Sequence, residues 1–227
     1  MIRPQVDRPR PLVVKVGGGL LRDEGLEGLR TACAEALELA ANRPVLVVPG
    51  GGPFADAVRA VDEQVGLDDA TAHALALQAM DQLGLLLRPL LPAAELLTDL
   101  VAPRALGLLQ AARAFANRPG VPESWTVTSD SLAVLAAAAI GADEAVLLKS
   151  VDGVLARWPS DEPPLPGLTA DELHELQERG GGRCVDAYLA EAVRRTDVAV
   201  VVRRPGGSGT RITRDQAPPV LARVPDP

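Results

Sequence analysis

The sequence predicts an α/β protein, a three-layer sandwich in which helices cover both faces of a mostly parallel central sheet. Short apolar runs such as LVVKV and PVLVV end near glycine triplets, which is typical of strands buried on both faces. Between these runs, apolar residues recur at helical spacing, so strand, helix and strand together form a βαβ unit. No segment of the 227 residues reads as a linker, and we expect one domain over residues 1–227.

The elements expected in the first half follow from apolar spacing and from the residues that break it. They are a strand at 12–16, a helix at 25–42, a strand at 44–48, helices at 53–64 and 69–87, and a short strand at 95–98. Residues 106–115 have a helical pattern, but Pro119 and Pro122 interrupt the chain soon afterwards, so the assignment of this stretch stays open.

The second half has sharper boundaries. Ser129 or Asp130 can cap a helix that closes at Gly141, and the pair Thr169 and Glu172 has the spacing of a capping box. The later elements are a strand at 144–149, helices at 169–179 and 188–195, a strand at 198–202 and, after a glycine-rich loop, an edge strand. We expect the proline-rich tail at 214–227 to fray.

Composition excludes several functions. With 30 acidic and 23 basic residues the net charge is −7, which argues against a nucleic-acid groove, and 2% aromatic residues offer no base-stacking platform. Uncharged stretches are too short to span a bilayer, and the first residues lack the apolar core of a signal peptide. Cys33 and Cys184 make no disulfide framework, so we expect a reduced, cytoplasmic protein with two structural thiols.

Two glycine triplets carry the first functional signal. Gly17, Gly18 and Gly19 follow the first predicted strand, and Gly50, Gly51 and Gly52 follow the second. One triplet alone is equally well explained as a tight turn. Because the carboxyl ends of parallel strands meet at one edge of a sheet, the pair favours a crevice whose backbone amides hold phosphate groups.

The two lysines carry the second signal. Of the 23 basic residues only Lys15 and Lys149 are lysine, and each stands at the end of an apolar run. A buried lysine is costly unless it has an anionic partner, which Asp130 or a phosphate could supply. Lys149 could also extend to water, and Asp130 could be a plain helix cap. His73 and His174 have no nucleophile or zinc pattern around them, and we expect both on helix surfaces.

The motifs together resemble the amino acid kinase family. They are KVGGG at 15–19, PGGGP at 49–53, TSDSLA at 128–133 and LKSVDGV at 148–154, in the family's order. The resemblance implies an acceptor-binding part at about 12–125 and an ATP-binding part at about 126–213. It also implies Mg²⁺ held through the ATP phosphates; the sequence assigns no metal ligand.

The resemblance assigns roles by position. Lys15, Asp130 and Lys149 would be catalytic, with Lys15 stabilising the transferring phosphoryl group and Asp130 orienting the lysines. The residues implied to contact ATP are Gly17, Gly18, Gly19, Ser129, Ser150, Asp152 and Gly153. The residues implied to contact the acceptor are Gly50, Gly51, Gly52, Asp81 and Asp186, and Asp56 is a further candidate for an amino group.

Two departures from the family pattern refine the expected reaction. Gly19 stands where many members have serine, and no lysine follows Lys149. Members that act on acyl acceptors often carry such a late lysine. Its absence favours the branch that phosphorylates an existing phosphate, as uridylate kinases do.

A finer resemblance is to the small kinases of methanofuran biosynthesis and their relatives in methylotrophic bacteria. AMDQLG at 79–84, WTVTSDS at 125–131 and Val185-Asp186 carry it. The implied reaction converts [5-(aminomethyl)furan-3-yl]methyl phosphate to its diphosphate with ATP. A kinase of nucleoside monophosphates such as UMP, and a non-catalytic nucleotide- or oxyanion-binding storage or regulatory subunit, stay open. The apolar stretch at 83–91 suggests a homo-oligomer.

Overall fold

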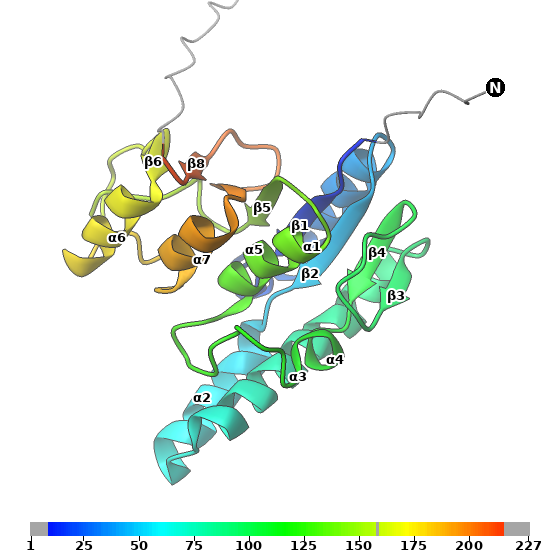
Figure 1. The fold of residues 1–227 in the computed structure, drawn as a ribbon, viewed down its shortest axis with the longest axis horizontal. Helices are drawn as coiled ribbons and strands as arrows, with labels where there is room; N and C mark the ends of the chain where they lie inside the picture. The colour runs from blue at the N-terminus through cyan, green and yellow to red at the C-terminus, as the bar shows by residue number, and fades with distance from the viewer. Residues whose placement is uncertain (1–8, 158, 216–227) are drawn as a thin grey trace, which may run out of the picture.

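The structure, a computed structural model, describes residues 9–157 and 159–215 and contains one eight-stranded sheet (Figure 1). In sheet order the strands are β3 (Glu95–Leu97), β4 (Leu106–Leu109), β2 (Val45–Pro49), β1 (Leu12–Val16), β5 (Glu144–Leu148), β7 (Ala199–Arg203), β8 (Thr210–Thr213) and β6 (Gly167–Thr169). Within these residues, β7 and β8 are antiparallel and every other neighbouring pair is parallel. The predicted α/β fold class is confirmed.

Helices cover both faces of the sheet (Figure 1). They are α1 (Gly18–Ala40), α2 (Gly52–Val65), α3 (Asp69–Leu87), α4 (Ala111–Phe115), α5 (Ser129–Ala139), α6 (Ala170–Glu178) and α7 (Leu189–Thr196), with a 3₁₀ turn at Arg88–Leu90. One apolar cluster joins α1 and the last turns of α3 to one face, and the other joins α4–α7 and the middle of α3 to the opposite face. None of the described helices is long and apolar enough to cross a membrane.

The direction of each β1 side chain follows from strand alternation. Val14 and Val16 belong to the cluster under α1, whereas Val13 belongs to the cluster under α5. Side chains two residues apart share a face, so Lys15 points the same way as Val13, toward α5. An otherwise apolar strand therefore delivers one ammonium group to the face that carries Asp130.

The carboxyl ends of the three central strands lie level with one another. Val16 pairs with Pro49 of β2 and with Leu148 of β5. The next residues, Gly17, Gly50 and Lys149, therefore leave the sheet side by side, as expected for a ligand crevice in an open parallel sheet.

Three sequence expectations need correction. The helix expected from residue 25 begins at Gly18, and Gly25, with φ of +64°, interrupts it, because a left-handed residue breaks the apolar spacing there. The stretch at 106–115 divides into β4 and α4 rather than forming one helix. The last strand, β8, is not at the edge, because the three-residue β6 lies outside it.

The remaining boundaries agree within one to three residues, including the capping box of α6 on Thr169 and Glu172. The predictions for the N-terminal leader and for the tail beyond Asp215 lie outside the described residues.

Candidate active site

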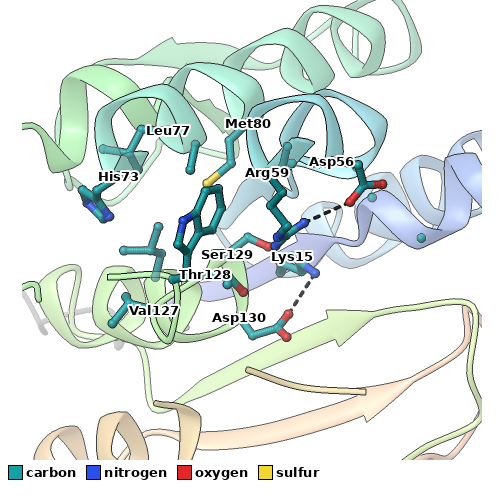
Figure 2. A pocket seen from close by; sticks show the side chains of 18 of the residues that line it. Lys15, Asp56, Arg59, His73, Leu77, Met80, Val127, Thr128, Ser129 and Asp130 are labelled. Atoms are coloured by element: carbon teal, nitrogen blue, oxygen red, sulfur yellow. Dashed lines mark hydrogen bonds and ion pairs between the residues drawn. The ribbon is translucent and has the colours of Figure 1, made fainter. Parts of the chain in front are cut away.

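A cavity of about 210 Å³ lies at the carboxyl ends of β1 and β2, enclosed by α2, α3 and the start of α5 (Figure 2). Many of the residues predicted from the sequence line it, namely Lys15, Gly18, Gly19, Gly51, Gly52, Ser129, Asp130 and Lys149. They come from four separate stretches of chain, which the level strand ends bring to one place.

The two glycine loops touch backbone to backbone. A Cβ atom on Gly18 would lie 2.1 Å from the amide nitrogen of Gly52, and Gly52 itself has φ of +54°. A Cβ atom on Gly50 would lie 2.7 Å from the amide nitrogen of Gly18. Side chains larger than hydrogen are therefore excluded at this junction.

Two helices begin at the same junction. α1 starts after Gly17 and α2 after Gly51, and neither cap has a side chain that accepts from the first turn. First-turn N–H groups have no acceptor within their own helix, and the helix dipole adds partial positive charge. The paired starts of α1 and α2 thus present N–H donors and partial positive charge at one wall of the cavity, an arrangement that suits an anion.

One carboxylate joins the two lysines. Asp130 Oδ1 lies 2.8 Å from Lys15 Nζ, and Asp130 Oδ2 lies 2.7 Å from Lys149 Nζ. The Asp130 and Lys15 side chains are each 5% exposed, and that of Lys149 is 14% exposed. The group carries one net positive charge when all three side chains are ionised, which leaves it ready to attract an anion.

Burial and charge set the ionisation of this group. Burial, with help from the charge of Lys149, lowers the pKa of Lys15 to about 8 although Asp130 opposes this. Burial also disfavours the charged form of Lys149, but Asp130 more than offsets it and raises its pKa. The two lysines likewise overcome the effect of burial on Asp130 and hold its pKa well below the ordinary value.

Asp186 lies behind this group rather than in the cavity. Its carboxylate accepts hydrogen bonds from the backbone amides of Thr128 and Ser131, at 2.9 Å each, and from both hydroxyl groups. Its own amide donates to Asp130 Oδ2 at 3.3 Å. Burial, with the charge of Asp130, raises the pKa of Asp186. Asp186 therefore caps α5 from a distant part of the chain and fixes the turn that presents Asp130.

Asp81 also lies away from the cavity. Its carboxylate accepts from the amide of Ala112 at 3.4 Å, at the start of α4, and it borders a separate depression with Gln82 and Arg88. Burial raises the pKa of Asp81. Of the three acids considered for an amino group, Asp56 is the one that lines the cavity.

The loop after β5 holds the remaining predicted nucleotide residues, outside the cavity. Arg204 donates to the Asp152 carboxylate and to the backbone carbonyl of Ser150. The hydroxyl group of Ser150 donates to the carboxylate of Asp23. Gly153 has no room for a side chain, since a Cβ atom would lie 2.6 Å from Thr210 Oγ1. Among residues 9–157 and 159–215, no three His, Cys, Asp or Glu side chains gather into a cluster that could hold a metal ion.

A network of charged and aromatic side chains that no sequence pattern predicts lies along α2 at the wall of the cavity. Arg22 and Arg59 each contact Asp56, at 2.6 and 2.9 Å. The guanidinium of Arg59 lies 4.9 Å from the centre of the Trp125 ring, whose indole N–H donates to Asp62 at 2.7 Å. This network links the charged end of the cavity to an aromatic wall.

His73 is buried, so its expected place on a helix surface is wrong. It lines the cavity together with Leu77 and Met80, which follow it on α3 at steps of four and seven residues. That spacing places His73 on the apolar face of α3 and could have predicted its burial. His174 is half exposed, as expected.

Comparisons with known proteins address the family and the fold of this chain. The chain matches the amino acid kinase family over residues 10–204. A [5-(aminomethyl)furan-3-yl]methyl phosphate kinase of Methanocaldococcus jannaschii is 27% identical over 154 residues, which are 65% of this chain and 69% of that protein. A uridylate kinase of Methanoregula boonei is 27% identical over 210 residues, covering 85% of this chain and 86% of that protein. The crystal structure of uridylate kinase from Archaeoglobus fulgidus has the same fold, with a TM-score of 0.68 and 21% identity over 89% of this chain and 99% of that one.

Proposed function

The chain belongs to the amino acid kinase family and is an ATP-dependent phosphotransferase, and we propose that its acceptor is [5-(aminomethyl)furan-3-yl]methyl phosphate. The product would be the corresponding diphosphate. The observation that carries a phosphate acceptor is the Lys15–Asp130–Lys149 group, set beside the paired starts of α1 and α2. Similarity to the Methanocaldococcus jannaschii kinase supports the choice of the furanyl compound.

The charge of the cavity suits two phosphate groups that approach each other. Its cationic side chains are Lys15, Lys149, Arg22 and Arg59, and its carboxylates are Asp56 and Asp130. Phosphoryl transfer needs mainly positioning and neutralisation of charge, because donor and acceptor are both anionic. Positive side chains and first-turn amides already held in place offset that repulsion without reorganisation during the reaction.

The glycine junction supports binding of the ATP phosphates, because the close backbone contact of Gly18 with Gly52 brings the first turns of α1 and α2 side by side. We expect Gly17, Gly18 and Gly19 to face the γ-phosphate and Gly50, Gly51 and Gly52 to face the acceptor. Mg²⁺ would enter with ATP, held through its phosphates, and would supply neutralisation of their negative charge. The part at about 12–125 would bind the acceptor, and the part at about 126–213 would bind the nucleotide.

In the proposed reaction an oxygen of the acceptor phosphate attacks the γ-phosphorus. The bond from that phosphorus to the β–γ bridging oxygen breaks, and ADP leaves. Lys15 would hold the transferring group, while Lys149 would hold the phosphates on the nucleotide side. Asp130 would keep both ammonium groups in place. No general base is required, because a phosphate anion has no proton to lose before it attacks.

The test is product analysis with a panel of acceptors. The purified protein with ATP and Mg²⁺ should add one phosphoryl group to the furanyl phosphate, as seen by mass spectrometry. Lys15→Met should lower turnover by more than about tenfold, which is about 1.4 kcal/mol on the barrier. Turnover of UMP instead would favour a nucleoside-monophosphate kinase, which the extent of similarity to the Methanoregula boonei protein also supports. Binding of ATP without any product would favour a non-catalytic subunit.

A further inference from the structure

His73 is a buried polar side chain that the proposed mechanism does not use. It is 8% exposed, and no hydrogen bond or ion pair joins it to another of the described residues. Burial lowers the pKa of His73, against the charge of the nearby Glu123, so the imidazole is neutral near pH 7. A neutral imidazole has one nitrogen that accepts a hydrogen bond and one that donates.

The position of His73 relates it to the acceptor. Figure 2 shows His73 at the opposite side of the cavity from Lys15, and Trp125 and Met80 also line this cavity. A molecule whose phosphate lies against Lys15 and the start of α2 would therefore extend its other end toward His73. His73 therefore lies at the end of the cavity remote from Lys15, and we assign it no part in phosphoryl transfer itself.

The walls between the two ends suit a small flat ring. Leu77, Met80 and Val127 line the cavity together with Trp125. Trp125 is fixed twice, by Arg59 over its ring at 4.9 Å and by its N–H bond to Asp62 at 2.7 Å. A fixed aromatic wall opposite flexible methionine gives a ring contact area at little cost in side-chain freedom.

The charged groups near the cavity leave His73 as the partner for a polar substituent. Asp56, the nearest acid on the acceptor side, already contacts Arg22 and Arg59. Because Asp56 lies beside these two arginines, we place it near the phosphate of the acceptor. It is then remote from the end of the acceptor that faces His73. Glu123, in the loop before Trp125, is exposed and borders a neighbouring depression that His73 also lines. Its negative charge acts on His73 and favours a cationic substituent there.

We propose that His73 is a specificity-determining residue, which accepts a hydrogen bond from the amino group of the acceptor at the end remote from its phosphate. The inference rests on the proposed function, because it takes the acceptor to be a ring with a phosphate arm and an aminomethyl arm. The ring lies against Trp125, and His73 reads the aminomethyl arm. His73 is a binding and positioning group, so it acts on acceptor affinity rather than on the chemical step.

The experiment compares two acceptors in two proteins. The acceptors are [5-(aminomethyl)furan-3-yl]methyl phosphate and its 5-methyl analogue, which lacks the amine. The proteins are the wild type and His73→Phe, which keeps the ring volume and removes the hydrogen bond. His73→Phe should raise KM for the aminomethyl acceptor by at least about tenfold, with kcat, KM for ATP and KM for the methyl analogue close to wild type.

Conservative variants separate this role from a structural one. His73→Gln and His73→Asn each keep a side-chain oxygen that can accept a hydrogen bond. In one of the two variants this oxygen should lie close to the place of the accepting imidazole nitrogen. That variant should show a stronger preference for the aminomethyl acceptor than His73→Phe does. Thermal unfolding reports whether His73→Phe folds. If it does not fold, His73→Gln and His73→Asn still test the proposal.

An equal change in KM for both acceptors in His73→Phe, or no change for either, would overturn the role of His73 while the proposed function stands. Absence of turnover of the aminomethyl acceptor by the wild type would instead overturn the proposed function, and the role of His73 with it.

Discussion

Replacement of Asp130 by asparagine should disturb this protein more than any other change of one charge. In the wild type a single carboxylate faces two buried ammonium groups, 2.8 Å from Lys15 and 2.7 Å from Lys149. Asparagine has nearly the same shape, so Asp130→Asn removes the charge and replaces one of the two accepting oxygens by an NH₂ group, which cannot accept from the ammonium that it faces. Both ammonium groups then remain buried without a counter-charge.

The expected loss of stability is large. Removal of one partner from a buried ion pair costs about 3–5 kcal/mol, because the remaining charge stays desolvated. A chain of this length loses about 2–4 °C of Tm for each kcal/mol, so the Tm of Asp130→Asn should fall by about 6–20 °C. The variant should also lower the pKa of both lysines. The unfolded chain then binds more protons than the folded one, so stability should recover in part as the pH rises.

Asp143→Asn is the matched control for this measurement. Asp143 also contacts two cations, Arg10 at 3.5 Å and Arg43 at 3.7 Å, but its side chain is 54% exposed. An exposed ion pair contributes about 0–1 kcal/mol, so this variant should lose no more than about that amount. Urea unfolding followed by circular dichroism, at pH 7 and again at about pH 9, gives both values.

Equal losses in Asp130→Asn and Asp143→Asn would refute the reasoning, because burial would then have no influence on the cost. The double variant Asp130→Asn, Lys149→Met extends the test by removing one of the two uncompensated charges. It should be more stable than Asp130→Asn alone if charge causes the loss. Purely additive losses would instead locate the damage in packing.

Three further changes test the site. Because the pKa of Lys15 is lowered to about 8, kcat/KM should fall as the pH rises above about 8, where the free enzyme loses that charge, and a profile that stays flat to about pH 10 would contradict this. Gly18→Ala should lower kcat by about 100-fold, because its Cβ would lie 2.1 Å from the Gly52 amide nitrogen. The control Gly84→Ala, whose Cβ would lie 3.5 Å from Pro49, should keep the wild-type kcat. Equal kcat values in the two variants would show that the glycine loops adapt to the added methyl group. Lys15→Arg and Lys149→Arg should each lower kcat by more than about tenfold in steady-state assays although they preserve charge, and wild-type rates in both would disprove the need for lysine.

The parts of the fold that could be predicted from the sequence are those with a local cause. The strands β1, β2 and β5 are largely apolar runs, followed by Gly17, Gly50 and Lys149, and parallel pairing brings these ends together. The strand β6 has only three residues, too few for any alternation to show. At 106–115 the strand and the helix each have too few residues to establish a period.

The parts of the site that the sequence could not predict depend on contacts between distant residues. Asp186 was expected at the acceptor, but it caps a helix 55 residues earlier in the chain through Ser131, and no local pattern encodes such a partner. The contact of Arg22 with Asp56 spans 34 residues in the same way. Asp130 could be named from the sequence as one of two candidate partners of Lys149, beside a phosphate, because a buried ammonium needs an anion.

Almost all basic residues of the chain are arginine, and only Lys15 and Lys149 are lysine. The geometry around Asp130 gives a physical reason for these two lysines. Arg204 shows the usual arrangement, in which one guanidinium spreads its donors over Glu24, Asp152 and the carbonyl of Ser150. Asp130 requires the reverse, one small anion shared by two cations in a buried place. Two arginines share Asp56 where all three side chains are about half exposed and water can satisfy the remaining donors. Around Asp130 the three side chains are only 5% to 14% exposed, so a guanidinium with five N–H donors would bury donors without partners. An ammonium group has only three donors, and those that do not bind Asp130 are available to a phosphate oxygen. Substitution of arginine for Lys15 or Lys149 should therefore lower both the stability of the fold and the turnover.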